Sequence, residues 1–299
     1  MILNENRKER IMRRAKRFLA LFLAAALLLL TGCGYFDTKM ARAIQKLSKL
    51  DSLHLCVELE LQAELSALGQ SMPLEGSIQI EGDAALDPLL AELELDLNLP
   101  GLDELLHCYV EKGDEVTNFY LRRNDGTLWQ KTGALDRDAS VGVDTLKYFI
   151  DGFSTFEAAE EETASIEGAT RYDGLITADF LNGLLEIYTL RTYLTEDLGL
   201  DLPEAVFEAM KDVPTSLWMD EKGRIVRLEL ELGELLTAVS EPILQSFGEK
   251  AGLDALALSL HLTGGRGVVE LSNFDGVDDL SLPAEVAAAW GAVKQPWEG

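Results

Sequence analysis

The side chains able to carry out chemistry are few and scattered in this sequence. Its three histidines are His54, His107 and His261, and the first two lie beside Cys56 and Cys108. A zinc site needs about four converging ligands, usually including a close pair in a loop. His54 and Cys56 instead belong to an alternating apolar pattern typical of a β-strand, in which two positions span about 7 Å. We therefore expect no metal site.

The remaining residues match none of the common catalytic motifs. The sequence has no Gly-x-Ser-x-Gly elbow, no His-Glu-x-x-His pair and no Gly-x-x-x-x-Gly-Lys phosphate loop. The segment from Asp136 resembles a calcium loop in spacing, but its sixth residue is Val141 instead of Gly and its twelfth is Lys147 instead of Glu. Carboxylates are too abundant for any one pair to indicate glycosidase chemistry. We expect a protein that is not an enzyme and has no cofactor.

The composition excludes several further classes of protein. The 299 residues include 52 acidic and 26 basic side chains, which gives a formal net charge of −26. Nucleic-acid binders need Lys and Arg to neutralise phosphates, so we expect no nucleic-acid partner. A hydrophobic content of 47% is too high for a wholly disordered chain. Three cysteines are too few for a small disulfide-rich scaffold.

Residues 1–32 have the features of a secretory signal peptide. Seven Lys and Arg side chains precede an uncharged apolar run of 13 residues, 18–30, whereas a membrane-spanning helix needs roughly 20. Either Met1 or Met12 could be the true start, because Met12-Arg13-Arg14 alone opens a complete basic region. The run ends in Leu30-Thr31-Gly32-Cys33, which resembles the lipobox of bacterial lipoproteins.

The lipobox resemblance implies a lipid anchor. In that family the cysteine thiol receives a diacylglycerol, and cleavage before the cysteine, here Cys33, makes it the new N-terminus. An ordinary signal peptide and an uncleaved anchor are the alternatives. We expect a protein anchored to the cell membrane on its extracytoplasmic face. Residues 1–32 carry seven basic and two acidic side chains, so the chain from Cys33 has a net charge of −31, and anionic headgroups should repel its body.

Alternating apolar residues predict long strands in the first half of the chain. Residues 53–65, 74–81 and 91–99 place apolar side chains on one face and polar ones on the other, as in antiparallel sheets. Weaker strands are expected near 105–112, 116–123 and 127–132, the last two joined by Asn124-Asp125-Gly126. In such a meander Cys56 and Cys108 lie about 14 Å apart. A disulfide needs Cα atoms within about 7 Å, so their pairing is the less favoured alternative.

The period changes to that of helices after residue 140. Amphipathic helices are expected over 35–50, 143–153, 179–194 with Thr177 or Asp179 as N-cap, 206–210 and 235–247. Further strands are expected over 166–173, 216–220, 225–232, 256–262 and 268–273. We interpret Gly264-Gly265-Arg266-Gly267 between the last two as a turn.

A long antiparallel sheet with one apolar face needs a second layer, which the helices supply. Strands this long must twist and curl. We therefore expect an α+β fold in which a long, strongly curved antiparallel sheet, a half-open barrel, clasps amphipathic helices. The expected organisation is a lipoprotein signal peptide at 1–32, an anchor tether and helix at 33–51, a single curved-sheet domain at 52–282, and a C-terminal helix or tail at 283–299.

This pattern resembles the LolA-like and LppX-like bacterial lipoproteins. The resemblance covers most of the chain after Cys33. It rests on the lipobox, the first helix leading into alternating strands, Leu128-Trp129-Gln130-Lys131, and Leu217-Trp218-Met219-Asp220 before residues 224–232. It implies a half-open sheet closed by helices, with acyl chains or lipoproteins carried between the layers without catalysis. Some related folds sense envelope stress instead, and a fold alone does not establish a ligand.

Two functions follow from these observations. The first is a membrane-anchored lipoprotein that binds or carries a hydrophobic, lipid-like ligand between sheet and helices. Its expected walls are the inward-facing Leu55, Val57, Leu59, Leu93, Leu95, Phe149, Phe180 and Leu184. The alternative is an envelope interaction or stress-sensing lipoprotein with a filled core, an envelope protein as its partner and no ligand. A void lined by Leu, Ile and Phe would favour the first.

Overall fold

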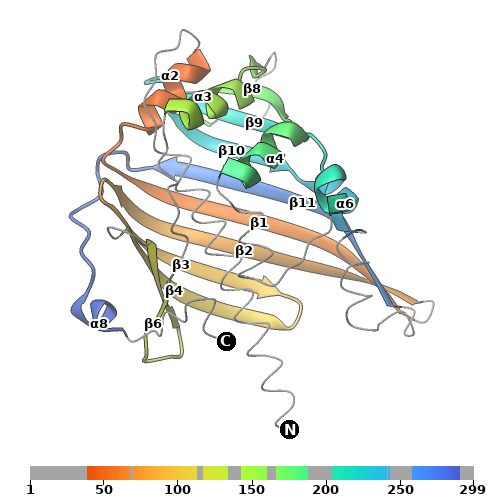
Figure 1. The fold of residues 1–299 in the computed structure, drawn as a ribbon, viewed down its shortest axis with the longest axis horizontal. Helices are drawn as coiled ribbons and strands as arrows, with labels where there is room; N and C mark the ends of the chain where they lie inside the picture. The colour runs from red at the N-terminus through yellow and green to blue at the C-terminus, as the bar shows by residue number, and fades with distance from the viewer. Residues whose placement is uncertain are drawn as a thin grey trace.

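The computed structural model describes residues 39–67, 70–112, 117–133, 143–159, 166–187, 204–240, 242 and 258–289 (Figure 1). These residues form an 11-stranded antiparallel sheet. The sheet is curved and open, because β6 and β7 are its two edges. Helices pack against one face, which we call the inner face. The α+β class expected from the alternating pattern is confirmed.

The first half of the sheet is a meander in which each strand pairs with the next in sequence. The expected alternation is present in β3, where buried and exposed residues follow one another strictly. Its strands are β1 (Ser52–Ala67), β2 (Gln70–Leu86), β3 (Leu89–Leu99), β4 (Leu102–Lys112), β5 (Thr117–Arg123) and β6 (Gln130–Gly133). The turn expected at Asn124-Asp125 follows β5, but the connection continues through Trp129, so β6 is shorter than 127–132.

The second half of the sheet begins at the far edge and returns to the first strand. Its strands are β7 (Glu157–Ala158), β8 (Ala169–Ile176), β9 (Val213–Asp220), β10 (Ile225–Glu231) and β11 (Leu258–Ser272). The strand order is β6-β5-β4-β3-β2-β1-β11-β10-β9-β8-β7. β11 pairs with β1 from His54 opposite Ser272 to Ala67 opposite Leu258. This pairing makes one sheet of the two halves.

The glycine-rich segment 264–267 is not the turn that the sequence suggested. β11 runs through it without interruption. Glycine is needed here for close packing, because a Cβ on Gly265 would lie 2.4 Å from Leu236 Cδ1 in the helical segment 233–240. The register of β1 against β11 also shifts at this point, and glycine accommodates such a bulge. The turn interpretation was wrong. Glycine is common both in turns and where elements pack closely, and only the tertiary packing distinguishes these two roles.

The described helices follow the expected changes of period. They are α2 (Lys39–Leu47), α3 (Val143–Gly152), α4 (Ala178–Ile187), α6 (Glu204–Glu208) and α8 (Ala284–Ala287). Thr177 is the N-cap of α4, because its hydroxyl accepts a hydrogen bond from the backbone N–H of Phe180 at 3.2 Å. Figure 1 shows α2, α3, α4 and α6 on the β8–β11 side of the sheet. Among the described helices, none has the length and apolar character to cross a membrane. Residues 188–194 of the expected helix 179–194 lie outside the described residues.

The main core lies between the inner face and the helices α2, α3 and α4. α2 contributes one side of its surface to this core, since Met40, Ala43 and Ile44 are buried. Lys39 and Arg42, on its other side, are exposed. Strand residues on the inner face pack against this side and against α3 and α4. Burying an amphipathic helix in this way supplies most of its stability, because a helix of nine residues is marginal alone.

A smaller apolar cluster lies on the outer face. Tyr109 of β4 and Tyr120 of β5 alternate with inner-face residues, and Val286 of α8 packs on them with 0% exposure. Trp129 contacts Tyr109 edge-on, with ring centroids 5.4 Å apart. The segment that contains α8 therefore covers β4 and β5 from outside.

Gly82 of β2 marks a close approach of two backbones. It pairs with Leu55 of β1 and Leu93 of β3. Its φ is +158°, and a Cβ there would lie 2.0 Å from the carbonyl oxygen of Glu92. Because the obstacle is backbone, no side chain can move aside to relieve it.

We predict that Gly82→Ala lowers the free energy of unfolding by about 2–3 kcal/mol, since overpacking and an unsuitable φ both oppose the folded state. Urea denaturation measures the change. Gly233→Ala is the control, because a Cβ there would meet nothing closer than 3.7 Å. Equal denaturation midpoints for Gly82→Ala and the wild type would contradict the observed strand approach.

Candidate ligand-binding face

The eight residues expected to line a ligand site gather on the inner face and on the helices over it. Leu59 and Leu184 are half-buried, and the other six are at most 6% exposed. These six are Leu55, Val57, Leu93, Leu95, Phe149 and Phe180. All six belong to the main core, and Leu184 packs against it. Their contact with a ligand stays a prediction.

Burial decreases along the inner face of β1. Leu53 and Leu55 are at most 1% exposed, whereas Leu59, Leu61 and Leu65, which point to the same side, are half-buried. We call these last three the open stretch of β1. Sequence reasoning did not distinguish this stretch from the rest of β1. Alternation shows on which face a residue lies, but it does not show how much of that face other elements cover.

Glycines flank the open stretch on both neighbouring strands. Leu61 pairs with Gly76 of β2 and with Gly265 of β11. The side chains nearest to those glycines belong to Leu99 and Leu236, and both are half-buried. The surroundings of Leu61 are thus apolar on both sides.

Aromatic rings fill the core under α3 and α4. Phe180 stacks on Tyr148 with centroids 4.9 Å apart, and it meets Phe149 and Phe153 edge-on at 5.8 and 6.1 Å. Phe180 also lies against Gly152, where a Cβ would come within 2.4 Å of its ring. Contacts this tight describe a packed core in this part of the molecule. The aromatic run in the sequence therefore marks the tight part of the interior.

A row of polar side chains crosses the outer face of the sheet. Each of its members pairs directly with the next across nine neighbouring strands, from β8 to β5 in sheet order. They are Arg171, Trp218, Arg227, Glu270, Cys56, Glu81, Glu94, His107 and Arg122. The ends of the row are basic and its middle is acidic. Opposite charges paired across strands stabilise a sheet, and like charges destabilise it.

The pairing in the acidic middle of the row confirms that the first three strands are neighbours, as expected. Glu81 of β2 stands directly opposite Glu94 of β3. His54 lies 2.8 Å from Asp83 and 3.5 Å from Glu81, and His107 lies 3.2 Å from Glu94. A neutral imidazole still donates one N–H, so both histidines have carboxylate partners. Within the described ranges, His, Cys, Asp and Glu do not form a group of three able to hold a metal ion.

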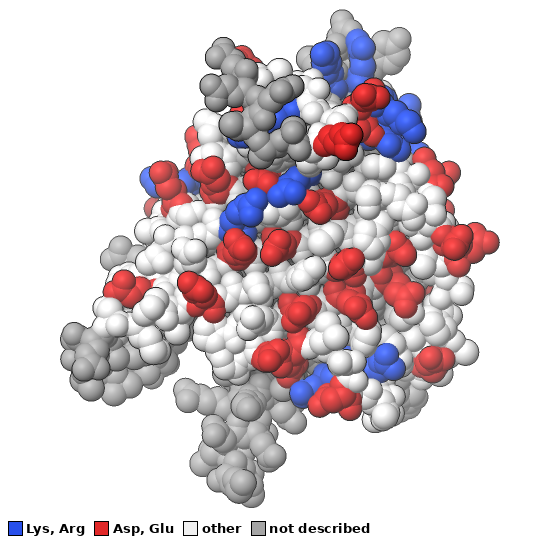
Figure 2. Space-filling view, turned by 180° about the vertical axis from the view of Figure 1, so that it is seen from behind, with Lys and Arg blue, Asp and Glu red and all other residues white. Residues whose placement is uncertain are grey.

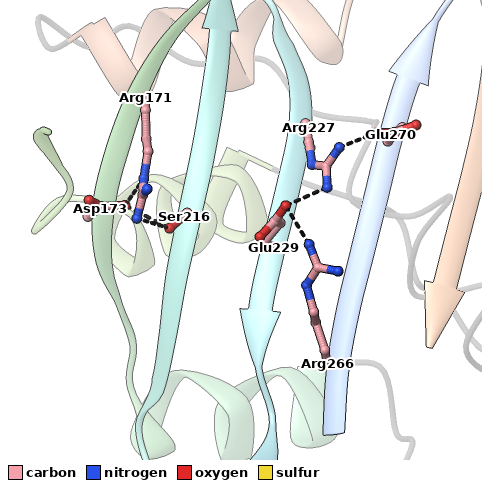
Figure 3. A network of polar contacts seen from close by, with 7 residues as sticks. All are labelled: Arg171, Asp173, Ser216, Arg227, Glu229, Arg266 and Glu270. Atoms are coloured by element: carbon pink, nitrogen blue, oxygen red, sulfur yellow. Dashed lines mark hydrogen bonds and ion pairs between the residues drawn. The ribbon is translucent and has the colours of Figure 1, made fainter. Parts of the chain in front are cut away.

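Arginines hold the other half of the outer face together (Figure 3). Arg227 donates hydrogen bonds to Glu229 at 2.5 Å and to Glu270 at 2.6 Å. Arg266 donates to the same oxygen of Glu229 at 2.8 Å. Arg266 also stands opposite Glu60 of β1. The acidic strand β1 therefore receives positive charge from Arg266 of β11.

A third arginine extends this network to β8 and β9. Arg171 donates to Asp173 at 2.7 Å and to Ser216 at 3.0 Å (Figure 3). The ring centroid of Trp218 lies 5.6 Å from the guanidinium carbon of Arg171 and 5.6 Å from the guanidinium carbon of Arg227. Trp218 is 3% exposed although it faces outward. It has a packing role, since both guanidinium groups make cation–π contacts with its ring.

The arginines lower the pKa of Glu229. Burial acting alone would raise this pKa, but hydrogen bonds and positive charges from Arg266 and Arg227 outweigh it. The pKa of Asp220 is lowered in the same way by Arg224 despite burial. A carboxyl group whose pKa is lower in the folded state stabilises the fold when it is ionised.

The two described cysteines are free thiols on opposite faces of the sheet. Cys56 belongs to the outer row on β1, and Cys108 is buried on the inner side of β4 with β2 and β3 between them. Burial raises the pKa of Cys56 and raises the pKa of Cys108 to about 12. The disulfide that the sequence left open does not form, and neither thiol has the lowered pKa of a nucleophile.

Comparisons with known proteins bear only on the fold. No protein-family model matches the sequence, and no curated protein matches it. Among solved structures, the chain is similar to a DUF1329 family protein from Desulfovibrio piger. The two are 8% identical with a TM-score of 0.21, and the match covers 81% of this chain and 92% of the other.

We predict that Glu229→Gln lowers the free energy of unfolding at pH 7 by about 1–3 kcal/mol, because two arginines lose a charged acceptor. The folded-state pKa lies below the ordinary 4.5. The ionised form therefore contributes fully above about pH 4.5, and its contribution is lost as the pH falls through the lower folded value. The melting temperature of Glu229→Gln, measured from neutral to acidic pH, should approach that of the wild type as the pH falls.

The matched control is Glu167→Gln, which changes an exposed carboxylate in the turn before β8. It should melt with the wild type at every pH. A difference between Glu229→Gln and the wild type that stays constant with pH would show that the charge of Glu229 contributes nothing to stability.

Proposed function

We propose that this protein is a lipoprotein anchored through Cys33 to the extracytoplasmic face of the cell membrane, where it binds or carries a hydrophobic, lipid-like ligand without catalysis. The observation that carries the proposal is the open stretch of β1, Leu59, Leu61 and Leu65, on the inner face of a curved sheet. The lipobox that ends at Cys33 supports the anchor. The sequence resemblance to LolA-like and LppX-like lipoproteins supports the class of ligand.

The chemistry of the open stretch favours acyl chains over polar ligands. Covering apolar surface yields about 25 cal/mol per Å², and Leu61 and its neighbours Leu99 and Leu236 offer no hydrogen-bonding side chain. Charged residues of β1, such as Glu58 and Glu60, point to the opposite face. A ligand held here would be selected for its apolar length, and its headgroup would contribute little.

A second candidate is an envelope interaction or stress-sensing lipoprotein with no ligand. The observation in its favour is the close packing of six of the eight expected wall residues, with Phe180 stacked 4.9 Å from Tyr148. In this case the inner face is simply the core of the fold. The two candidates differ in whether an apolar ligand binds to the open stretch.

We predict that Cys33→Ala abolishes labelling of the protein by a fatty-acid probe, because its thiol is the acceptor of the lipid. The variant should be released from the membrane or accumulate as uncleaved precursor, as gel mobility of membrane and soluble fractions would show. Cys56→Ala is the matched control and should label normally, since that thiol lies in the folded sheet. Undiminished labelling of Cys33→Ala would remove the anchor.

We predict that Leu59→Gln weakens binding of a fluorescent fatty-acid analogue about tenfold, which corresponds to about 1.4 kcal/mol of lost apolar contact. Leu59 is half-buried, so the variant should fold, which its melting curve would verify. The control Leu128→Gln makes the same change where the side chain is 80% exposed, and its binding should equal that of the wild type. A wild-type protein that binds no analogue would favour the second candidate.

A further inference from the structure

A stripe of basic side chains runs along the exposed side of the first helix. Lys39, Arg42, Lys46 and Lys49 follow one another at intervals of three and four residues, and all four are exposed. Residues at such intervals share one side of a helix, and here Lys49 continues the stripe into the turn after α2. The opposite side of α2 is buried in the main core, so the stripe has a fixed direction on the folded domain.

The turn between β9 and β10 adds a fifth cation beside this stripe. The Nζ of Lys46 donates a hydrogen bond to the backbone carbonyl of Lys222, and the side chain of Lys222 is exposed. We call Lys39, Arg42, Lys46, Lys49 and Lys222 the basic pole. Figure 2 shows several Lys and Arg side chains at the corner of the molecule where α2 lies, with Asp and Glu beside them and over the rest of that face.

The lysines of the basic pole differ from the arginines of the outer face in their described partners. Among the residues that the structure describes, no ion pair joins Lys39, Lys49 or Lys222 to Asp or Glu. By contrast, Arg224 pairs with Asp220 at 2.6 Å. A chain with 52 acidic residues offers many potential partners. The charges of Lys39, Lys49 and Lys222 are therefore available to a partner outside the chain.

The carboxylates adjacent to the pole do not cancel it. Asp51 follows Lys49, Glu221 precedes Lys222, and Asp275 accepts a hydrogen bond from the backbone N–H of Asp51 at 2.8 Å. These three negative charges are fewer than the four lysines of the pole, Lys39, Lys46, Lys49 and Lys222. Among the described residues, lysines therefore outnumber the carboxylates named beside them.

The position of the pole in the chain places it next to the expected anchor. Six residue steps separate Cys33 from Lys39, and a chain of that length spans at most about 22 Å. If Cys33 carries the lipid, as proposed above, then α2 is the described element held closest to the membrane along the chain. Because α2 is packed into the core, the whole domain moves with it.

We infer that the basic pole docks on anionic phospholipid headgroups of the membrane in which Cys33 is anchored. This inference rests on the proposed lipid anchor. The overall negative charge does not prevent the contact, because salt screens interactions beyond about 8 Å at physiological ionic strength. Charges within that distance of the headgroups determine the interaction, and juxtamembrane Lys and Arg are attracted there. The anchor supplies proximity and the pole supplies orientation.

The test uses the lipidated protein inserted from outside into preformed vesicles of phosphatidylcholine, with or without about a third of phosphatidylglycerol. Acetic anhydride, a neutral reagent, modifies exposed lysines, and mass spectrometry gives the rate at each one. We expect Lys39, Lys49 and Lys222 to react at least about threefold more slowly on the anionic vesicles. Salt at about 1 M, which shortens the screening length to about 3 Å, should restore the rates.

Lys211 is the internal control for the reagent. It is exposed and precedes β9, so it lies about 25 Å from the turn at Lys222, the length of that strand. Its rate should be equal on both vesicles. The double variant Lys39→Gln, Lys49→Gln should lose the protection of Lys222, whereas Lys211→Gln should retain it.

The outcomes separate the anchor from the docking surface. An intact mass without acyl chains would overturn the anchor and this inference with it. An acylated protein whose pole lysines react equally on neutral and anionic vesicles would overturn the docking alone and leave the anchor in place. Protection that persists in the double variant would also overturn the assignment of the pole.

Discussion

The pairing of β1 with β11 is the contact on which the rest of the structure depends. It runs from His54 opposite Ser272 to Ala67 opposite Leu258 and joins segments far apart in the sequence. Without it, the meander β1–β6 and the strands β7–β10 would form two smaller sheets. A long strand with one apolar side would then be an exposed edge, which promotes aggregation. The main core, the outer row and the bulge beside Gly265 all exist because β11 returns to β1.

Local patterns predict the elements of this fold well. Alternation over 53–65 and 91–99 anticipates β1 and β3, because each strand has one solvated side that selects polar residues. The N-cap at Thr177 and the start of α4 follow from local rules of the same kind. The segment 264–267 fails this test, since glycine favours a turn locally and its actual role is to admit Leu236. That role depends on a helix packed across the strand, which no local pattern contains.

The candidate site could be predicted only in part for a similar reason. Alternation correctly places Leu55 and Leu59 on one face, but the sequence does not show that the first is 1% exposed and the second half-buried. Coverage of a face depends on where the helices lie over it. The outer row is equally non-local, since Trp218 acquires its two arginine contacts only when β8, β9 and β10 are neighbours. Sequence identified the layers, and tertiary packing determined which part of the inner face stays accessible.

The charge of this protein is sorted by secondary structure, and that sorting changes what its net charge means. Period-two alternation places carboxylates such as Glu58 and Glu81 on the outer face of the sheet, where Arg266 partly offsets the negative charge of β1. The helical period of α2 instead gathers lysines on one side of a short element. The net charge of −31 carried by the chain from Cys33, averaged over the molecule, predicts repulsion from an anionic surface. Because screening limits the interaction to the nearest residues, the side that faces the surface decides its sign, and the proposed anchor at Cys33 would set that side.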